Sequence, residues 1–154
     1  VAPEELEFFT GQLSVVPEGL LAAEFGVHAM HDVTEGGILG AVREICLAAG
    51  VGAEIWEERV YVPELTRRIC AHLGLDPLAL LSSGALLIAS PQGQELKAKL
   101  EEAQVSAFLI GRITPGSHPV LIRASGERVK IAKHVEDELW KLFARMEEGT
   151  HHGS

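Results

Sequence analysis

The chain has 154 residues, 47% hydrophobic side chains and a formal net charge of -9 at pH 7. This length and apolar content suit one domain with a single sizeable core. The negative charge argues against a broad surface for nucleic acid or anionic membrane, although a single loop can still bind a small anion. No apolar run approaches the roughly 20 residues that cross a bilayer, and the N-terminus VAPEELEFF lacks the basic start of a signal peptide. These features predict a cytoplasmic protein.

The first half of the chain is expected to mix helices with strands, and several of the helices end at a glycine. Helical spacing and alternation predict helices over 3–10 and 17–25, a strand over 27–31, a helix over 38–49, a strand over 51–55 and a helix over 63–73. Pro17 and Pro63 suit a first helical turn, and the glycines that follow the later helices suit their ends.

The second half begins with a turn that Asp76 can cap. It continues with a strand over 85–89 whose unbroken apolar run indicates burial on both faces, a helix over 92–104, a strand over 105–113, a hairpin formed by 118–124 and 128–132, and a helix over 135–146. Leu139, Leu142 and Phe143 are expected on one face of that last helix. The whole order predicts a mixed α/β (α+β) domain.

Two cysteines, Cys46 and Cys70, lie within helical patterns. They are too few for a disulfide framework or a four-ligand zinc site. We expect both to be reduced core residues.

The strongest candidate for chemistry is the segment HAMHDVTEGGILG, residues 28–40. An alternating strand here leads through Asp32, Thr34 and two adjacent glycines into the start of a helix. The first N–H groups of a helix lack partners within the helix, and with the helix dipole they favour an anion such as phosphate. Gly36 and Gly37 would let such a ligand approach the backbone closely because they have no side chain.

The same segment also fits a capping box, which is a structural alternative. Asp32 or Thr34 would accept hydrogen bonds from the first helical N–H groups, and Glu35 would reach back to the start of the motif. Sequence alone leaves both interpretations open.

Histidines before this junction offer a possible acid or base. His28 and His31 are three residues apart on a strand, so their side chains point to opposite faces and cannot easily share a metal ion. His31, next to Asp32, could move a proton or donate to phosphate, or it could be a structural histidine with satisfied hydrogen bonds. The other histidines show no ligand spacing, so no metal site is predicted.

A second loop of small residues, Ser82-Ser83-Gly84, precedes the apolar strand over 85–89. It could be a simple turn or a loop that approaches a ligand. No Walker-type loop, serine-nucleophile elbow or HExxH motif accompanies it.

Taken in order, the segments HDVTEGGILGAVREI, VGAEI, LGLDPLALLSSGALLIA and LIGRI resemble the C-terminal domain of the aminoimidazole-ribonucleotide synthetase superfamily, over about residues 13–115. That superfamily includes the hydrogenase-maturation factor HypE, selenophosphate synthetase, thiamine-monophosphate kinase and formylglycinamidine-ribonucleotide synthetase. Among these branches the motifs resemble those of HypE most. The resemblance implies a layered α/β/α domain with a mixed sheet and a partial ferredoxin-like likeness.

The resemblance also implies an ATP-using, dimeric enzyme whose N-terminal domain carries most of the ATP and magnesium ligands. Its C-terminal domain closes the cleft. The residues expected to bind phosphate or substrate, in or beside the matching loops, are Thr34, Glu35, Gly36, Gly37, Ser83 and Gly84. His31 and Asp32 are the candidate catalytic residues. No tightly bound cofactor is expected in this chain itself.

The chain departs from the HypE pattern in two places. Glu35 stands where the HypE motif has arginine, and no cysteine follows Cys70, whereas HypE proteins end in a cysteine-bearing tail that receives a carbamoyl group. We therefore consider two hypotheses about the function of this chain. The first is the C-terminal domain of a HypE-like ATP-dependent enzyme that activates an amide or carboxyl-type oxygen, inactive without its ATP-binding domain. The second is a non-catalytic binding or assembly module on the same scaffold.

The expected domain organisation follows from the resemblance. Residues 1–12 would be an extension or linker, 13–148 the synthetase-like C-terminal domain, and 149–154 a tail or tag. The expected partners are an N-terminal ATP-binding domain of a longer parent chain, a second copy in a homodimer and a maturation factor, with no nucleic acid or membrane.

Overall fold

The computed structural model describes residues 13–150, with side chains through residue 147. In chain order the elements are α2 (Val16–Phe25), β1 (Ala29–Asp32), α3 (Gly37–Ala49), β2 (Gly52–Trp56), the 3-10 turn η1 (Glu57–Arg59), α4 (Glu64–Leu73), β3 (Leu86–Ala89), α5 (Gly93–Glu102), β4 (Gly111–Thr114), β5 (Pro119–Ile122), β6 (Arg128–Lys130) and α6 (Glu138–Thr150). The helix expected over 3–10 lies outside the described residues.

The strands form two sheets. β1 and β3 pair antiparallel, and the other four strands lie in the order β4-β2-β5-β6. In this larger sheet β2 and β5 run parallel, whereas the two outer pairs are antiparallel. A parallel pair needs a long crossover, which here contains α4, β3, α5 and β4. The predicted mixed α/β class and the β5–β6 hairpin are confirmed.

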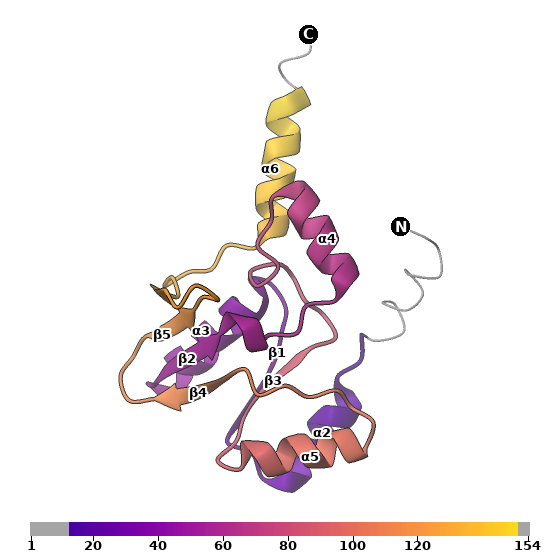
Figure 1. Cartoon of the computed structure of the whole chain (residues 1–154), viewed down its shortest axis with the longest axis vertical. Helices are drawn as coiled ribbons and strands as arrows, with labels where there is room; N and C mark the ends of the chain where they lie inside the picture. Colours follow the sequence, from indigo (N-terminus) through magenta and orange to yellow (C-terminus); the bar gives the residue numbers. More distant parts are fainter. Residues whose placement is uncertain (1–12, 151–154) are drawn as a thin grey trace.

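Two hydrophobic cores meet at β3. In the larger core α3 packs against β2 and β5, and Leu87 of β3 contacts this core. The smaller core packs α2 against α5, at the end of the molecule opposite α6, and Ile88 of β3 contacts that core (Figure 1). Neighbouring side chains of a strand point to opposite faces, so the apolar run of β3 serves both cores, as expected.

Three helices, α2, α3 and α4, end where the sequence predicts. Gly26, Gly50 and Gly74 each follow a helix in the left-handed conformation, with φ of 86°, 66° and 65°. Glycine adopts this conformation without the penalty that a Cβ brings. The expected turn at Asp76 is also present, because the Leu78 N–H donates to Asp76 Oδ1.

The strand expected over 105–113 is wrong for most of its length, since β4 comprises only Gly111–Thr114. The chain before β4 passes from one core to the other. Val105 and Ala107 contact the smaller core, whereas Ile110 contacts the larger one and accepts a hydrogen bond from the Trp56 N–H. Apolar burial therefore produced a strand-like pattern without a continuous pairing partner.

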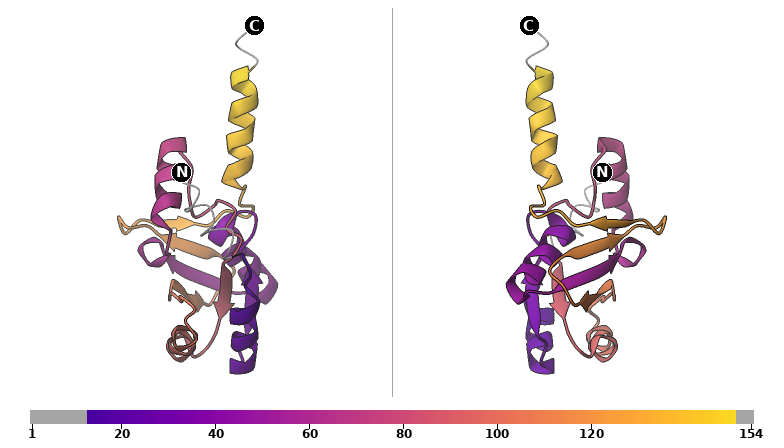
Figure 2. Two further views of the ribbon diagram at one scale, coloured as in Figure 1. Left: turned by 90° about the vertical axis from the view of Figure 1, so that its right-hand side faces the viewer. Right: turned by 90° about the vertical axis from the view of Figure 1, so that its left-hand side faces the viewer.

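The last helix begins later than expected and projects from the body of the molecule (Figure 2). It starts at Glu138 because Asp137 caps it, accepting a hydrogen bond from the Leu139 N–H at 2.8 Å. Leu139, Leu142 and Phe143 are spaced to share one face of α6, as expected, although Phe143 is 45% exposed and its ring lies 6.0 Å from the Trp140 ring. The helix also runs to Thr150, two residues into the expected tail.

Candidate functional site

The junction between β1 and α3 is a tight turn with exposed polar side chains. Thr34 and Glu35 are exposed, whereas Gly36 and Gly37 are buried in the left-handed conformation, with φ of 74° and 59°. Among the described residues no hydrogen bond engages the side chains or N–H groups of Thr34 and Glu35. These groups are available to a ligand.

The double glycine is required by the packing of the chain itself. A Cβ built on Gly37 would lie 2.6 Å from the carbonyl oxygens of Leu78 and Leu80, and one on Gly36 would lie 3.1 Å from the Val135 oxygen. Side-chain-free residues therefore let two distant segments approach the start of α3. This explains the glycines without a ligand.

The capping box, one of the two alternatives for this segment, is not formed. No side chain of the TEGG turn caps α3. Instead, the buried Gly36 N–H donates to Asp137 Oδ2 at 2.8 Å, and the Leu39 N–H donates to the Leu78 oxygen at 3.1 Å. The N-terminus of α3 thus attracts an anion as its dipole predicts, and the anion is a carboxylate of the same chain. Sequence reasoning missed Asp137, because its only local signal is that of a cap for α6.

His31 is held by both of its ring nitrogens. Nδ1 lies 2.6 Å from the Asp32 carbonyl oxygen, and Nε2 lies 2.6 Å from Glu44 Oε2 on α3. A carbonyl oxygen only accepts hydrogen bonds, so Nδ1 carries a hydrogen in this arrangement. The ring links β1 to α3, which favours the structural interpretation of His31. Its catalytic role stays a prediction, as does that of Asp32, whose side chain is exposed.

The structure brings the two candidate loops together. Asp32 at the end of β1 pairs with Leu86 at the start of β3, and the Val33 N–H donates to the Ala85 oxygen. Ser83 and Gly84 directly precede this pairing, so their loop lies at the same end of the small sheet as the TEGG turn. Ser83 is exposed and Gly84 is half-buried with φ of 92°. Binding by these residues remains a prediction.

A buried cation on α3 was also missed by the sequence analysis. Arg43 is only 9% exposed, and within the described part of the chain its Nη1 has no hydrogen-bond partner. It forms no ion pair at 4.0 Å or less with those residues. Burial raises the pKa of the nearby Cys46 thiol, and the Arg43 charge opposes that rise. Both cysteines are free and buried, as expected.

Both candidate loops lie within a segment of the chain that matches a known protein family. The family model described as AIR synthase related protein, C-terminal domain, matches residues 10–124. The chain belongs to this family. In the AIR synthase-related domain, the matched range contains both candidate loops, whereas Asp137 and α6 lie outside it.

The relatives of this AIR synthase-related domain include carbamoyl dehydratase HypE. The Rhodobacter capsulatus protein of that name is 35% identical over 79 residues, which is 51% of this chain and only 23% of that protein. A crystal structure of Escherichia coli HypE superposes with a TM-score of 0.74 and 28% identity, covering 85% of this chain and 42% of the other. A hydrogenase maturation protein HypE in complex with ATP gives a TM-score of 0.62 and 27% identity, covering 69% and 35%. The chain therefore spans less than half of each of these proteins.

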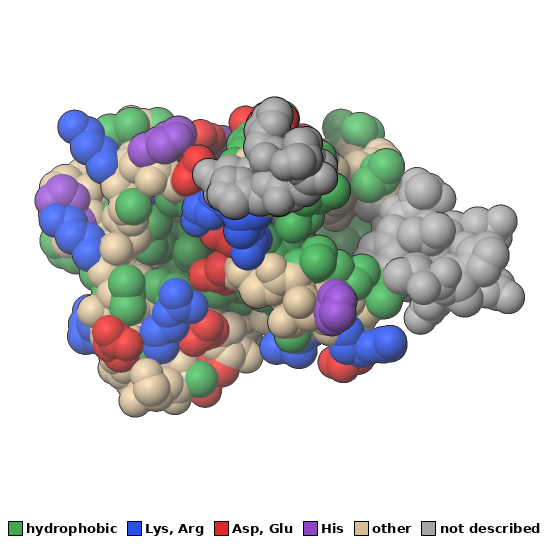
Figure 3. Space-filling model, turned by 90° about the horizontal axis from the view of Figure 1, so that it is seen from above, with side chains coloured by type: hydrophobic (Ala, Val, Ile, Leu, Met, Phe, Trp, Pro, Cys, Tyr) green, Lys and Arg blue, Asp and Glu red, His purple; other side chains and the backbone are tan. Residues whose placement is uncertain are grey.

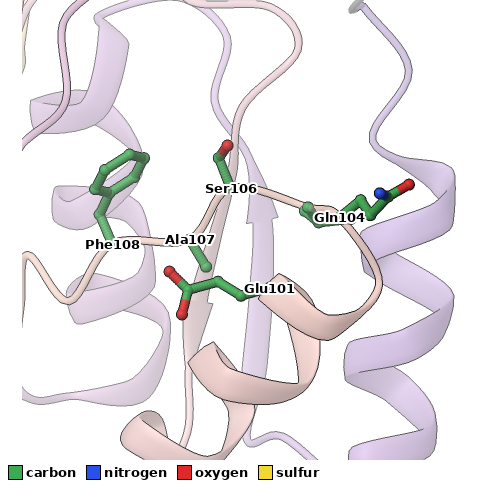
Figure 4. Close-up of a pocket in the computed structure, with 6 residues that line it drawn as sticks. Glu101, Gln104, Ser106, Ala107 and Phe108 are labelled. Carbon is green, nitrogen blue, oxygen red and sulfur yellow. The ribbon is translucent and has the colours of Figure 1, made fainter.

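Two surface hollows of the described residues lie away from the junction. One, of about 230 Å³, lies at the end of α5 and is lined by Glu101, Gln104, Val105, Ser106, Ala107 and Phe108 (Figure 4). Another is lined by residues of α6.

Viewed from above, cationic, acidic and apolar side chains are interspersed (Figure 3). The described residues contain no cluster of three or more potential metal ligands among His, Cys, Asp and Glu. None of the helices in this part of the chain is long and apolar enough to cross a bilayer.

Proposed function

We propose that this domain is the C-terminal part of a HypE-like ATP-dependent enzyme, which activates an amide or carboxyl-type oxygen by phosphorylation during hydrogenase maturation. The relatives named carbamoyl dehydratase suggest the chemistry. Loss of water from a carbamoyl group removes its oxygen, and phosphorylation converts such an oxygen into a good leaving group. The ATP-bound HypE relative supports ATP as the phosphoryl donor.

The observation that carries this proposal is the meeting of the two loops at one end of the β1–β3 sheet. Thr34 and Ser83 would donate hydroxyl hydrogen bonds to phosphate or substrate oxygens. The free N–H groups of Thr34 and Glu35 would add backbone donors. His31 and Asp32 would orient the acceptor or move a proton.

ATP and magnesium would be bound mainly by an N-terminal domain of the parent chain. Residues 13–148 would close the cleft, with 1–12 as an extension or linker. A homodimer and a maturation-factor partner complete the proposed assembly.

The test is an NMR titration of the domain with ATP, phosphate and sulfate. We expect amide shifts at Thr34, Glu35 and Gly84, weakened by Thr34→Val. Ser117→Ala, an exposed change in the turn before β5, is the matched control. Unchanged amide signals at millimolar ligand would rule out an autonomous anion site in these loops.

Asp137 favours a second candidate, a binding or assembly module without catalysis. Its carboxylate already accepts the hydrogen bond of the Gly36 N–H, and the neighbouring Glu35 adds a further negative charge. The two candidates differ in the parent protein. ATP turnover that falls on Thr34→Val supports the enzyme, whereas an intact parent without ATP turnover supports the module.

A further inference from the structure

The four-stranded sheet has one face turned away from α3. Along β2, Ala53 and Ile55 are buried against α3, so the alternating residues Glu54 and Trp56 lie on the opposite face. The strand register and the Arg59–Trp56 contact define this open sheet face, which includes Glu54, Trp56, Arg59, Arg112, Val120, Ile122, Arg128 and Lys130. Among the described helices, α3 is the one with extensive contacts to this sheet.

The open sheet face is cationic in an acidic chain. It carries three arginines and a lysine against the single carboxylate of Glu54. Arg112 and Arg128 bind the two oxygens of that carboxylate at 2.7 and 2.5 Å. Glu54 is 14% exposed, whereas the two arginine side chains are 67% and 56% exposed, so their outer N–H groups remain accessible.

Arg59 is the best-placed free cation on this face. Its guanidinium carbon lies 4.5 Å from the centroid of the Trp56 ring. Within the described residues it has neither an ion pair nor a hydrogen bond, although it is exposed. Stacking on an aromatic ring orients the planar guanidinium while leaving its N–H edge available for a carboxylate.

We propose that the open sheet face docks an acidic segment of a partner protein, with Arg59 binding one of its carboxylates. Val120 and Ile122 are half-buried and supply apolar contact between the cations. Single-stranded nucleic acid fits less well, because Arg59 and Arg112 already lie over the only aromatic ring of this face. This proposal does not depend on the phosphate-binding loops.

The test uses a fluorescein-labelled 12-residue peptide of alternating Glu and Leu. Its controls are a peptide with Gln in place of Glu and a 12-nucleotide oligothymidylate. Anisotropy measures affinity, and Trp56 fluorescence in a Trp140→Phe background reports contact with the face, since the chain has two tryptophans.

We expect the acidic peptide to bind and to change Trp56 fluorescence. Arg59→Gln should weaken its binding by about tenfold or more, the effect of losing a charge-assisted hydrogen bond. Arg67→Gln, an exposed arginine of α4, should leave it unchanged. Absent binding, equal binding of the Gln peptide, tighter binding of the oligonucleotide, or equal losses in both variants would each overturn the proposal.

Discussion

Asp137 is predicted to be a main contributor to stability, because one carboxylate caps two helices. Its Oδ2 accepts from the Gly36 N–H and its Oδ1 from the Leu139 N–H, both at 2.8 Å, and the residue is 4% exposed. Asp137→Ala removes the cap of α6, which costs about 1 kcal/mol, and leaves a buried N–H without a partner, which costs about 1–3 kcal/mol. We expect a loss of about 2–4 kcal/mol in the free energy of unfolding.

Urea denaturation followed by circular dichroism measures this loss, provided that the m-value is unchanged. Asp32→Ala is the matched control, since Asp32 is exposed and its carboxylate has no partner among the described residues; we expect a change within about 0.5 kcal/mol. Asp137→Asn should fall between the two, because the amide keeps one acceptor. If Asp137→Ala costs no more than Asp32→Ala, the double-cap argument is wrong.

Three further changes test other parts of the structure. Gly37→Ala should lower the free energy of unfolding by at least about 2 kcal/mol, because the residue has a positive φ and the new Cβ would lie 2.6 Å from two carbonyl oxygens. Gly50→Ala is the control in the same urea assay: Gly50 has a similar φ but open space around it, so the loss should be only about 1–2 kcal/mol. Arg43→Met should raise the urea midpoint, because it removes a buried Nη1 that has no hydrogen-bond partner among the described residues. A lowered midpoint would contradict this reasoning. Hydrogen bonds from Arg128 and Arg112 hold the pKa of Glu54 below its ordinary value of 4.5. The stability that the Glu54 carboxylate contributes is therefore present above pH 4.5 and is lost as the pH falls through the lowered pKa. The stability difference between wild type and Glu54→Gln should therefore shrink with acidification, and a difference that stays constant would contradict this assignment.

The sequence predicted features that local chemistry determines. The glycines after α2, α3 and α4 could be read as helix ends because a left-handed residue is needed there whatever the rest of the chain does. The β5–β6 hairpin and the burial of β3 on both of its faces could likewise be predicted from short sequence segments.

Long-range contacts were not predictable in this way. The capping box failed because Asp137, 101 residues from Gly36 in the sequence, supplies the cap that the adjacent Asp32, Thr34 and Glu35 do not. Glu44 and Arg43 were missed for a related reason. Helical spacing places them on α3, but only the packing of the elements decides that one faces His31 and the other is buried.

The position of β3 between the two cores has a consequence for cooperativity. Leu87 and Ile88 are adjacent in the chain yet contact different cores, so neither core can open fully without disturbing the same strand. The domain should therefore unfold as one cooperative unit, in spite of its two sheets. In native-state hydrogen exchange, the paired amides of β1 and β3 should exchange only through global unfolding, whereas the projecting end of α6 should exchange through local opening.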